Sequence, residues 1–108
     1  MRWLIPVFAL TSSMALADPA TDRLFRGKCA ACHGADGKGQ TEQGKKMQVR
    51  DMTSAEFQSA TDDKIKAAIN DGVKAEKNGV KQEMDGYKAK LRPDQIDGLV
   101  AYVRGLKK

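Results

Sequence analysis

One stretch of five residues holds every soft metal-binding side chain of this sequence except methionine. Cys29 and Cys32 are the only cysteines of the chain, and the next residue, His33, is its only histidine. On a helix, positions i, i+3 and i+4 share one face, so both sulfurs and the imidazole would point the same way. Two thiols so spaced can add to the two vinyl groups of a haem while the adjoining histidine reaches the iron. The stretch therefore predicts one covalently attached c-type haem, with His33 as an axial ligand.

Three other uses of two cysteines at this spacing fit the sequence less well. A zinc site needs four ligands, and the chain offers one cysteine pair and one histidine. A thiol–disulfide oxidoreductase carries such cysteines after a strand in a βαβ unit, which this sequence does not predict. A structural disulfide that closes so short a loop would stabilise little. Haem attachment is the favoured interpretation.

Methionine is the other soft side chain that could bind the iron, on the side opposite His33. A thioether ligand favours Fe(II), raises the reduction potential and fills the site, so that only electrons move. Met1 and Met14 lie in a segment that we expect to be removed, which leaves Met47, Met52 and Met84. Met47 and Met52 could instead fill gaps against the haem or the core.

The first seventeen residues have the composition of a signal peptide. Arg2 gives a positive start, residues 3–10 are apolar, and residues 15–17 read Ala-Leu-Ala, the small-x-small pattern of a cleavage site. The apolar run is well short of the roughly 20 residues that span a membrane. We expect cleavage of 1–17 and export, to the periplasm in a bacterium, without stable membrane insertion. Export fits covalent haem attachment, which takes place outside the bacterial cytoplasm.

Residues 18–108 are expected to form one moderately basic domain. Loss of Arg2 leaves 18 Lys and Arg against 14 Asp and Glu. This balance indicates either an acidic partner, reached by electrostatic steering, or simple solubility. Nucleic acid is a poor partner for an exported chain without a concentrated basic run.

The apolar spacing predicts an all-α domain of three to five helices joined by long loops. Asp18-Pro19 can start a first helix that ends near Cys32-His33. Cap chemistry favours a short helix over 53–57 and a longer one from Thr61 to Gly72. The clearest helix begins at Pro93 and keeps apolar residues three and four apart. No segment alternates with a period of two, so we name no strand, and 40–51 and 73–91 look irregular.

So few large side chains would struggle to build a core alone. The aromatic residues of the expected domain are Phe25, Phe57, Tyr87 and Tyr102. Small domains bury a modest fraction of their surface and often need a cofactor. Long loops are also unusual unless they wrap something. A large, flat, apolar cofactor would meet both needs.

These features together resemble the small soluble class I cytochromes c over essentially all of residues 18–108. The likeness rests on Phe25 before the motif, on Cys29 to Gly34, on the loop Asp36-Gly37-Lys38-Gly39, on Met84, and on a closing helix with Leu99 and Tyr102. It implies the cytochrome c fold, with loops wrapped around one haem. In that fold the first and last helices cross closely, and Gly98 would ease the approach.

The resemblance also implies roles for individual residues. Met84 becomes the sixth ligand, because the family keeps its methionine in the loop before the last helix. Asp85 follows it where the family has proline, so the loop loses a fixed φ and the bond to iron could be labile. Arg92 stands where Ser or Thr more often caps the last helix, at some cost in stability.

Charged side chains around the expected haem edge are candidates for two further roles. Arg50 is the candidate for the haem propionates, because a guanidinium suits carboxylates, although it could equally be a solvent-exposed charge. Candidates for docking an acidic partner are Lys28, Lys38, Lys81 and Lys88.

The predicted function is that of an exported, diffusible electron carrier, and not an enzyme. It would cycle between Fe(II) and Fe(III), with His33 and Met84 as axial ligands, and exchange electrons with exported or membrane-bound redox proteins. One alternative is a haem-based gas-binding or sensing module from which Met84 detaches. Another is a peroxidase-like or oxidase-associated subunit with a labile sixth ligand.

Overall fold

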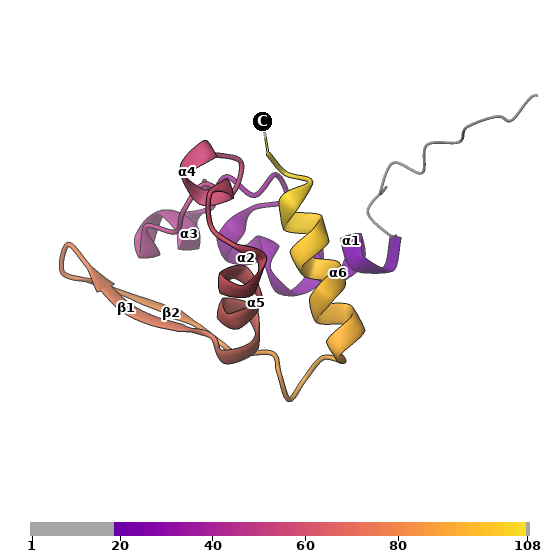
Figure 1. Cartoon of the computed structure of the whole chain (residues 1–108). Helices are drawn as coiled ribbons and strands as arrows, with labels where there is room; N and C mark the ends of the chain where they lie inside the picture. Colours follow the sequence, from indigo (N-terminus) through magenta and orange to yellow (C-terminus); the bar gives the residue numbers. More distant parts are fainter. Residues whose placement is uncertain (1–18, 108) are drawn as a thin grey trace, which may run out of the picture.

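The computed structural model describes residues 19–107 and is mostly helical (Figure 1). The expected signal peptide, 1–17, and Asp18, the expected cap of the first helix, lie outside the described residues. Among residues 19–107, none of the helices has the length and apolar character of a membrane span. In chain order the elements are α1 (Pro19–Lys28), α2 (Ala30–His33), α3 (Glu42–Met47), α4 (Ala55–Gln58), α5 (Asp62–Asp71), β1 (Val73–Lys77), β2 (Val80–Met84) and α6 (Pro93–Arg104).

Hydroxyl side chains begin three of the helices. Thr41 accepts from Gly44 N at 2.9 Å, Ser54 from Phe57 N at 3.1 Å, and Thr61 from Lys64 N at 3.2 Å. Each bond satisfies a backbone N–H that has no partner within the helix. The predicted helices after Ser54 and Thr61 are confirmed. The helix after Thr41 was missed, because its six residues are too short and polar for an apolar period to show.

The last helix begins at Pro93 as predicted, and its first turn is closed without a hydroxyl cap. The Arg92 side chain has no acceptor atom, but Arg92 N–H donates to Gln95 Oε1 at 2.9 Å. The Arg92 guanidinium turns instead to Asp94, 3.1 Å away. One half of a capping box thus offsets part of the expected cost.

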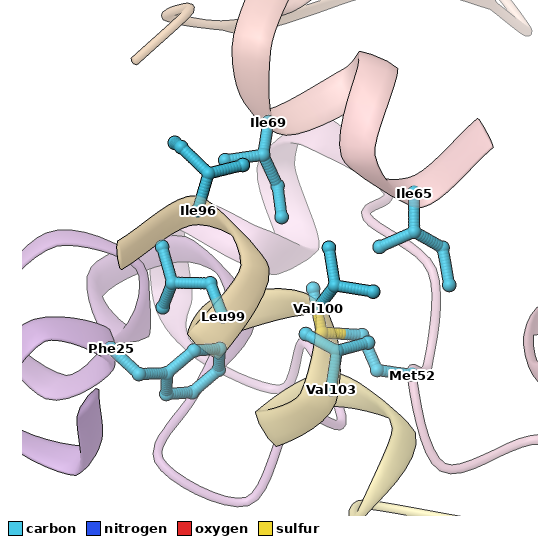
Figure 2. Packing of buried hydrophobic residues seen from close by; sticks show 8 residues of the cluster. All are labelled: Phe25, Met52, Ile65, Ile69, Ile96, Leu99, Val100 and Val103. Carbon is cyan, nitrogen blue, oxygen red and sulfur yellow. The ribbon is translucent and has the colours of Figure 1, made fainter. Parts of the chain in front are cut away.

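The core lies where α6 packs between α1 and α5 (Figures 1 and 2). The Phe25 and Tyr102 rings are 4.6 Å apart at their centroids, tilted by 31°. A Cβ at Gly98 would lie 3.0 Å from Thr21 Oγ1, so α1 and α6 approach closely, as the family resemblance implied. The buried apolar side chains are Phe25, Met52, Ile65, Ile69, Ile96, Leu99, Val100 and Val103.

A β-hairpin projects from this body beside α3, and the expectation that 73–91 has no strand is wrong for its first part (Figure 1). Its strands pair antiparallel from Val73↔Met84 to Lys77↔Val80. Asn78 and Gly79 both have positive φ, 53° and 78°, and Asn-Gly is the strongest short signal for a tight hairpin turn. Polar Lys77 and Gln82 fall on the more apolar face and hide the alternation. The all-α class holds, with this small addition and six helices in the described part, several of one turn.

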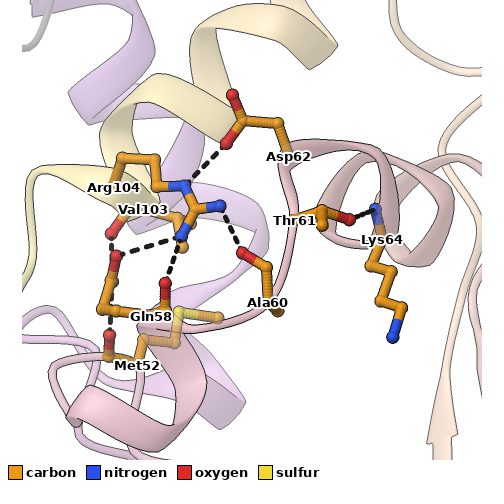
Figure 3. Close-up of polar contacts among 8 residues, drawn as sticks. All are labelled: Met52, Gln58, Ala60, Thr61, Asp62, Lys64, Val103 and Arg104. Carbon is orange, nitrogen blue, oxygen red and sulfur yellow. Dashed lines mark hydrogen bonds and ion pairs between the residues drawn. The ribbon is translucent and has the colours of Figure 1, made fainter.

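A polar cluster fastens the connection between α4 and α5 to the end of α6 (Figure 3). Arg104 donates to Gln58 O at 2.8 Å, to Ala60 O, and to Asp62 Oδ1 at 2.6 Å. Gln58 Nε2 donates to Met52 O at 2.7 Å and to Val103 O at 3.0 Å. One guanidinium thus gives hydrogen-bond donors to the carbonyls of Gln58 and Ala60, which lie where the chain leaves α4.

Replacing Arg104 with lysine should lower the stability of the protein. A lysine ammonium lacks the planar fork that reaches Gln58 O, Ala60 O and Asp62 together. We expect a loss of about 1–3 kcal/mol, seen as a lower urea midpoint at an unchanged slope. Arg26→Lys is the matched control, since Arg26 contacts Asp22 on an exposed surface and should cost about 0.5 kcal/mol or less. Equal losses in both variants would contradict the role given to Arg104.

Candidate functional site

The backbone keeps a helical course through the two cysteines and the histidine. Cys29 separates α1 from α2, yet its N–H donates to Phe25 O at 2.8 Å and its carbonyl accepts from His33 N at 2.9 Å. These are the bonds of a continuing helical turn. Cys29, Cys32 and His33 therefore have the i, i+3, i+4 spacing on one face that their chemistry requires. The first helix ends where the sequence predicted, with a break at Cys29.

The two thiols lie in a partly buried place next to the core. Neither forms a disulfide, and the Cys29 side chain packs against the core cluster. Burial raises the pKa of the Cys29 thiol to about 11, with a smaller contribution from nearby Cys32. Burial also raises the pKa of Tyr87, to which Cys29, Asp85 and Cys32 add. Tyr87, from the segment after β2, thus lies near both thiols.

The His33 side chain is half-buried, and one of its ring nitrogens has no polar partner in the described residues. Its Nδ1 atom has no hydrogen bond there, and burial lowers the pKa of the ring. A buried polar atom left unpaired costs about 1–3 kcal/mol, so such atoms usually have a role or a partner from outside the chain. A neutral imidazole is also the form that binds metals.

Glycines and one hydroxyl bring α3 against the motif. Gly34 takes φ 80° directly after His33, and Gly39 N–H donates back to His33 O at 2.8 Å. Thr41 Oγ1 bonds Ala31 O at 2.8 Å. At Gly44 an added Cβ would overlap Cys32 O, so α3 can approach this closely only with glycine there. The loop expected over Asp36 to Gly39 therefore turns the chain back so that α3 packs against the cysteine motif.

Backbone contacts hold the residues around Met84 against the end of α5. Met84 is the last residue of β2, is half-buried and packs on the core. A Cβ at Gly72 would overlap Met84 O, and one at Gly86 would lie 2.6 Å from Asn70 O. Tyr87 N–H donates to Ile69 O at 2.8 Å. The backbone around Asp85, where the family has proline, is therefore held in part by packing against α5.

One contact links this segment to the helix that leads into the motif. Tyr87 Oη lies 3.4 Å from Lys28 O, at the end of α1 and directly before Cys29. Cys29, Met84 and Tyr87 also pack against the same core cluster, so the Met84 segment and the cysteine motif share one core. In the sequence, the only indication of this contact is the tyrosine three residues after Met84.

The other candidate methionines occupy different environments. Met52 is buried within the core, with 7 % of its surface exposed, which is the gap-filling use weighed above. Met47 ends α3 and is half-buried. No group of three or more His, Cys, Asp or Glu able to hold a metal ion occurs in residues 19–107. One histidine and one methionine suit an iron that a porphyrin already holds by its four nitrogens, so the donor set fits a haem.

The charged candidates are at the surface. Arg50 is exposed, makes no hydrogen bond or ion pair with the rest of the described chain through its guanidinium, and follows Val49, which packs on Gly39. Its role toward a propionate stays a prediction. The docking candidates Lys28, Lys81 and Lys88 are exposed and Lys38 is half-buried.

Comparisons with known proteins agree on one family. Residues 20–107 match the family model described as cytochrome c. The chain is 31% identical over 99 residues to cytochrome c6 of Nostoc sp. (strain PCC 7120 / SAG 25.82 / UTEX 2576), covering 91% of this chain and 79% of that protein. Among solved structures it is similar to the KustC0563 c-type cytochrome, with 34% identity, a TM-score of 0.68, and 82% and 98% of the two chains covered. A point mutant of that protein matches with 34% identity and a TM-score of 0.65, over 81% and 98% of the chains.

Replacing Gly44 with alanine should destabilise the protein although Gly44 is helical. An alanine would normally gain about 0.5–1 kcal/mol inside a helix. Here its Cβ would overlap Cys32 O, and the forced shift of α3 should cost about 1–3 kcal/mol. Urea unfolding of the haem-loaded protein measures whether the substitution lowers or raises the free energy of unfolding.

Gly27→Ala is the matched control, because Gly27 lies in α1 with nothing within 4 Å of an added Cβ. That variant should be as stable as the parent or more so. A Gly44→Ala protein that gained stability like Gly27→Ala would show that α3 does not press on the motif.

Proposed function

The chain belongs to the cytochrome c family, and from this premise we propose an exported, diffusible one-electron carrier whose haem has His33 and Met84 as axial ligands. Family membership makes it a cytochrome c electron carrier with covalently bound haem c, an electron-transfer protein and not an enzyme. When bound, the haem supplies an iron that alternates between Fe(II) and Fe(III). The observation that carries the proposed ligation is the buried Nδ1 atom of His33, which has no hydrogen-bond partner in the described residues and lies on the same helical turn as both cysteines.

Each site residue has one task in this proposal. Cys29 and Cys32 bond the haem covalently, which prevents its loss from a chain that leaves the cell interior. His33 gives the iron a nitrogen ligand, and its buried position keeps the ring neutral. Met84 adds a neutral sulfur that favours Fe(II) and occupies the position where a small molecule would otherwise bind. Arg50 pairs with a propionate.

The proposed export rests on the N-terminal segment, and the proposed choice of partner rests on the charged surface. Residues 1–17 act as the signal peptide, and residues 18–108 are the working domain, in the periplasm of a bacterium. Exposed Lys28, Lys81 and Lys88, with half-buried Lys38, present positive charge to acidic patches on exported or membrane-bound redox proteins. Electrostatic steering speeds such brief encounters more than it tightens them.

The covalent bond is tested by denaturing the protein in acidified organic solvent. We expect haem to stay with the chain in the parent and to be extracted from the variant with both Cys29→Ser and Cys32→Ser. The single variants keep one thioether and should retain haem with a shifted absorption maximum, because one vinyl group stays conjugated with the ring. Extraction of haem from the parent would overturn the attachment.

The sixth ligand is tested by replacing each candidate methionine. A sulfur–iron(III) bond gives a weak far-red absorption band, which Met84→Ala should abolish while Met47→Ala and Met52→Leu keep it. The reduced Met84→Ala protein should also bind CO, because its iron has an open position. Loss of the band in Met47→Ala alone would give the ligand to Met47. A parent that lacks the band and binds CO would favour the gas-binding alternative.

A further inference from the structure

The structure points to Gln82 as a positioning residue for Met84, a role that rests on the proposed function of Met84 as an iron ligand. We infer that the Gln82 amide, by fastening the hairpin to α3, holds the Met84 sulfur at the iron. No local sequence pattern assigns Gln82 a role.

The Gln82 side chain makes two hydrogen bonds to the end of α3. Its Nε2 donates to Met47 O at 2.9 Å and to Gln48 O at 3.0 Å. Gln48 ends the helix in the left-handed region, with φ 52°. The last carbonyls of a helix have no partner within it, so a side-chain amide that satisfies two of them is an anchor and not a chance surface contact.

Strand geometry transmits this anchor to Met84. Residues two apart in a strand face the same side, so Gln82 and Met84 lie on one face of β2. Across the hairpin they pair with Ala75 and Val73, which fixes both in one ladder. A shift of Gln82 away from α3 would therefore move Met84 as well.

The same helix is fastened to the cysteine motif at its other end. Thr41, the cap of α3, donates to Ala31 O at 2.8 Å and to Cys32 O at 3.1 Å. Hydrogen bonds thus connect the motif to α3 and α3 to Gln82, and the strand β2 connects Gln82 to Met84. They fix the methionine relative to the turn that carries His33.

The need for such an anchor follows from the residue after Met84. Asp85 is exposed and does not restrict φ as proline would. Downstream, Tyr87 and Lys88 N–H groups bond Ile69 O and Asn70 O at 2.8 and 3.1 Å. Upstream, Gln82 supplies the bonds from the hairpin's inner face to α3, so Met84 is held from both flanks.

The experiment measures imidazole binding to the oxidised haem-loaded protein, because imidazole competes with the methionine sulfur. Gln82→Ala should raise the affinity for imidazole about tenfold, the scale of losing two ordinary hydrogen bonds, and weaken the far-red band. Gln82→Lys keeps a donor within reach of the two carbonyls and should restore most of the parent behaviour.

Two controls separate positioning from general destabilisation. Glu83→Ala changes the neighbouring exposed residue on the opposite face of β2 and should leave imidazole affinity unchanged. Arg104→Lys lowers global stability where α6 meets the connection between α4 and α5, and it should also leave imidazole affinity unchanged. Gln82→Ala with parental affinity and band, or a rise of the same size in Arg104→Lys, would overturn the role of Gln82 while Met84 stays the ligand. A Met84→Ala protein that kept the band would overturn the proposed ligation itself, and the role of Gln82 with it.

Discussion

The packing of α6 against both α1 and α5 is the contact on which the rest of the structure depends. Its buried face touches Phe25 from α1 and Ile69 from α5, two helices that have little direct contact with each other within residues 19–107. The cysteine motif follows directly after α1, and the Met84 segment follows α5 by way of the hairpin. A single helix at the end of the chain thus joins the two parts that would hold a haem between them. Glycine at position 98 lets the first of these contacts be close.

Away from that core, order comes mainly from polar groups that satisfy the backbone of short elements. Helices of four to six residues are marginal by themselves and need such partners. Thr41, Gln58, Gln82 and Arg104 each bond carbonyls or N–H groups from distant segments. This arrangement lets long connections follow defined paths without a large apolar interior. It also suits a domain whose interior is completed by a cofactor.

The sequence predicted the features that rest on local chemistry. The cysteine motif, the caps Ser54 and Thr61, the stop at Gly72 and the amphipathic helix from Pro93 follow from side-chain type and spacing, and the structure has them. The hairpin was not predicted, although Asn78-Gly79 is typical of its turn. Polar Lys77 and Gln82 interrupt the alternation of apolar and polar residues along its strands. Helix α3 and the bonds made by Gln82 and Arg104 join residues far apart in sequence, and no local pattern contains them. The Met84 segment and the cysteine motif likewise meet only through tertiary contacts, among them the hydrogen bond from Tyr87 to the end of α1.

The charged outer face of the hairpin has a consequence for how the protein behaves when crowded. A two-stranded ribbon exposes unpaired backbone groups along both edges, which invites strands of other chains to add. Here the ladder places Lys74 opposite Glu83 and Glu76 opposite Lys81, all four exposed. A strand from a second molecule would have to cover part of this charged surface, and the ladder places no like charges directly opposite each other at these positions. The exposed charges along the hairpin thus oppose the addition of a strand from another molecule.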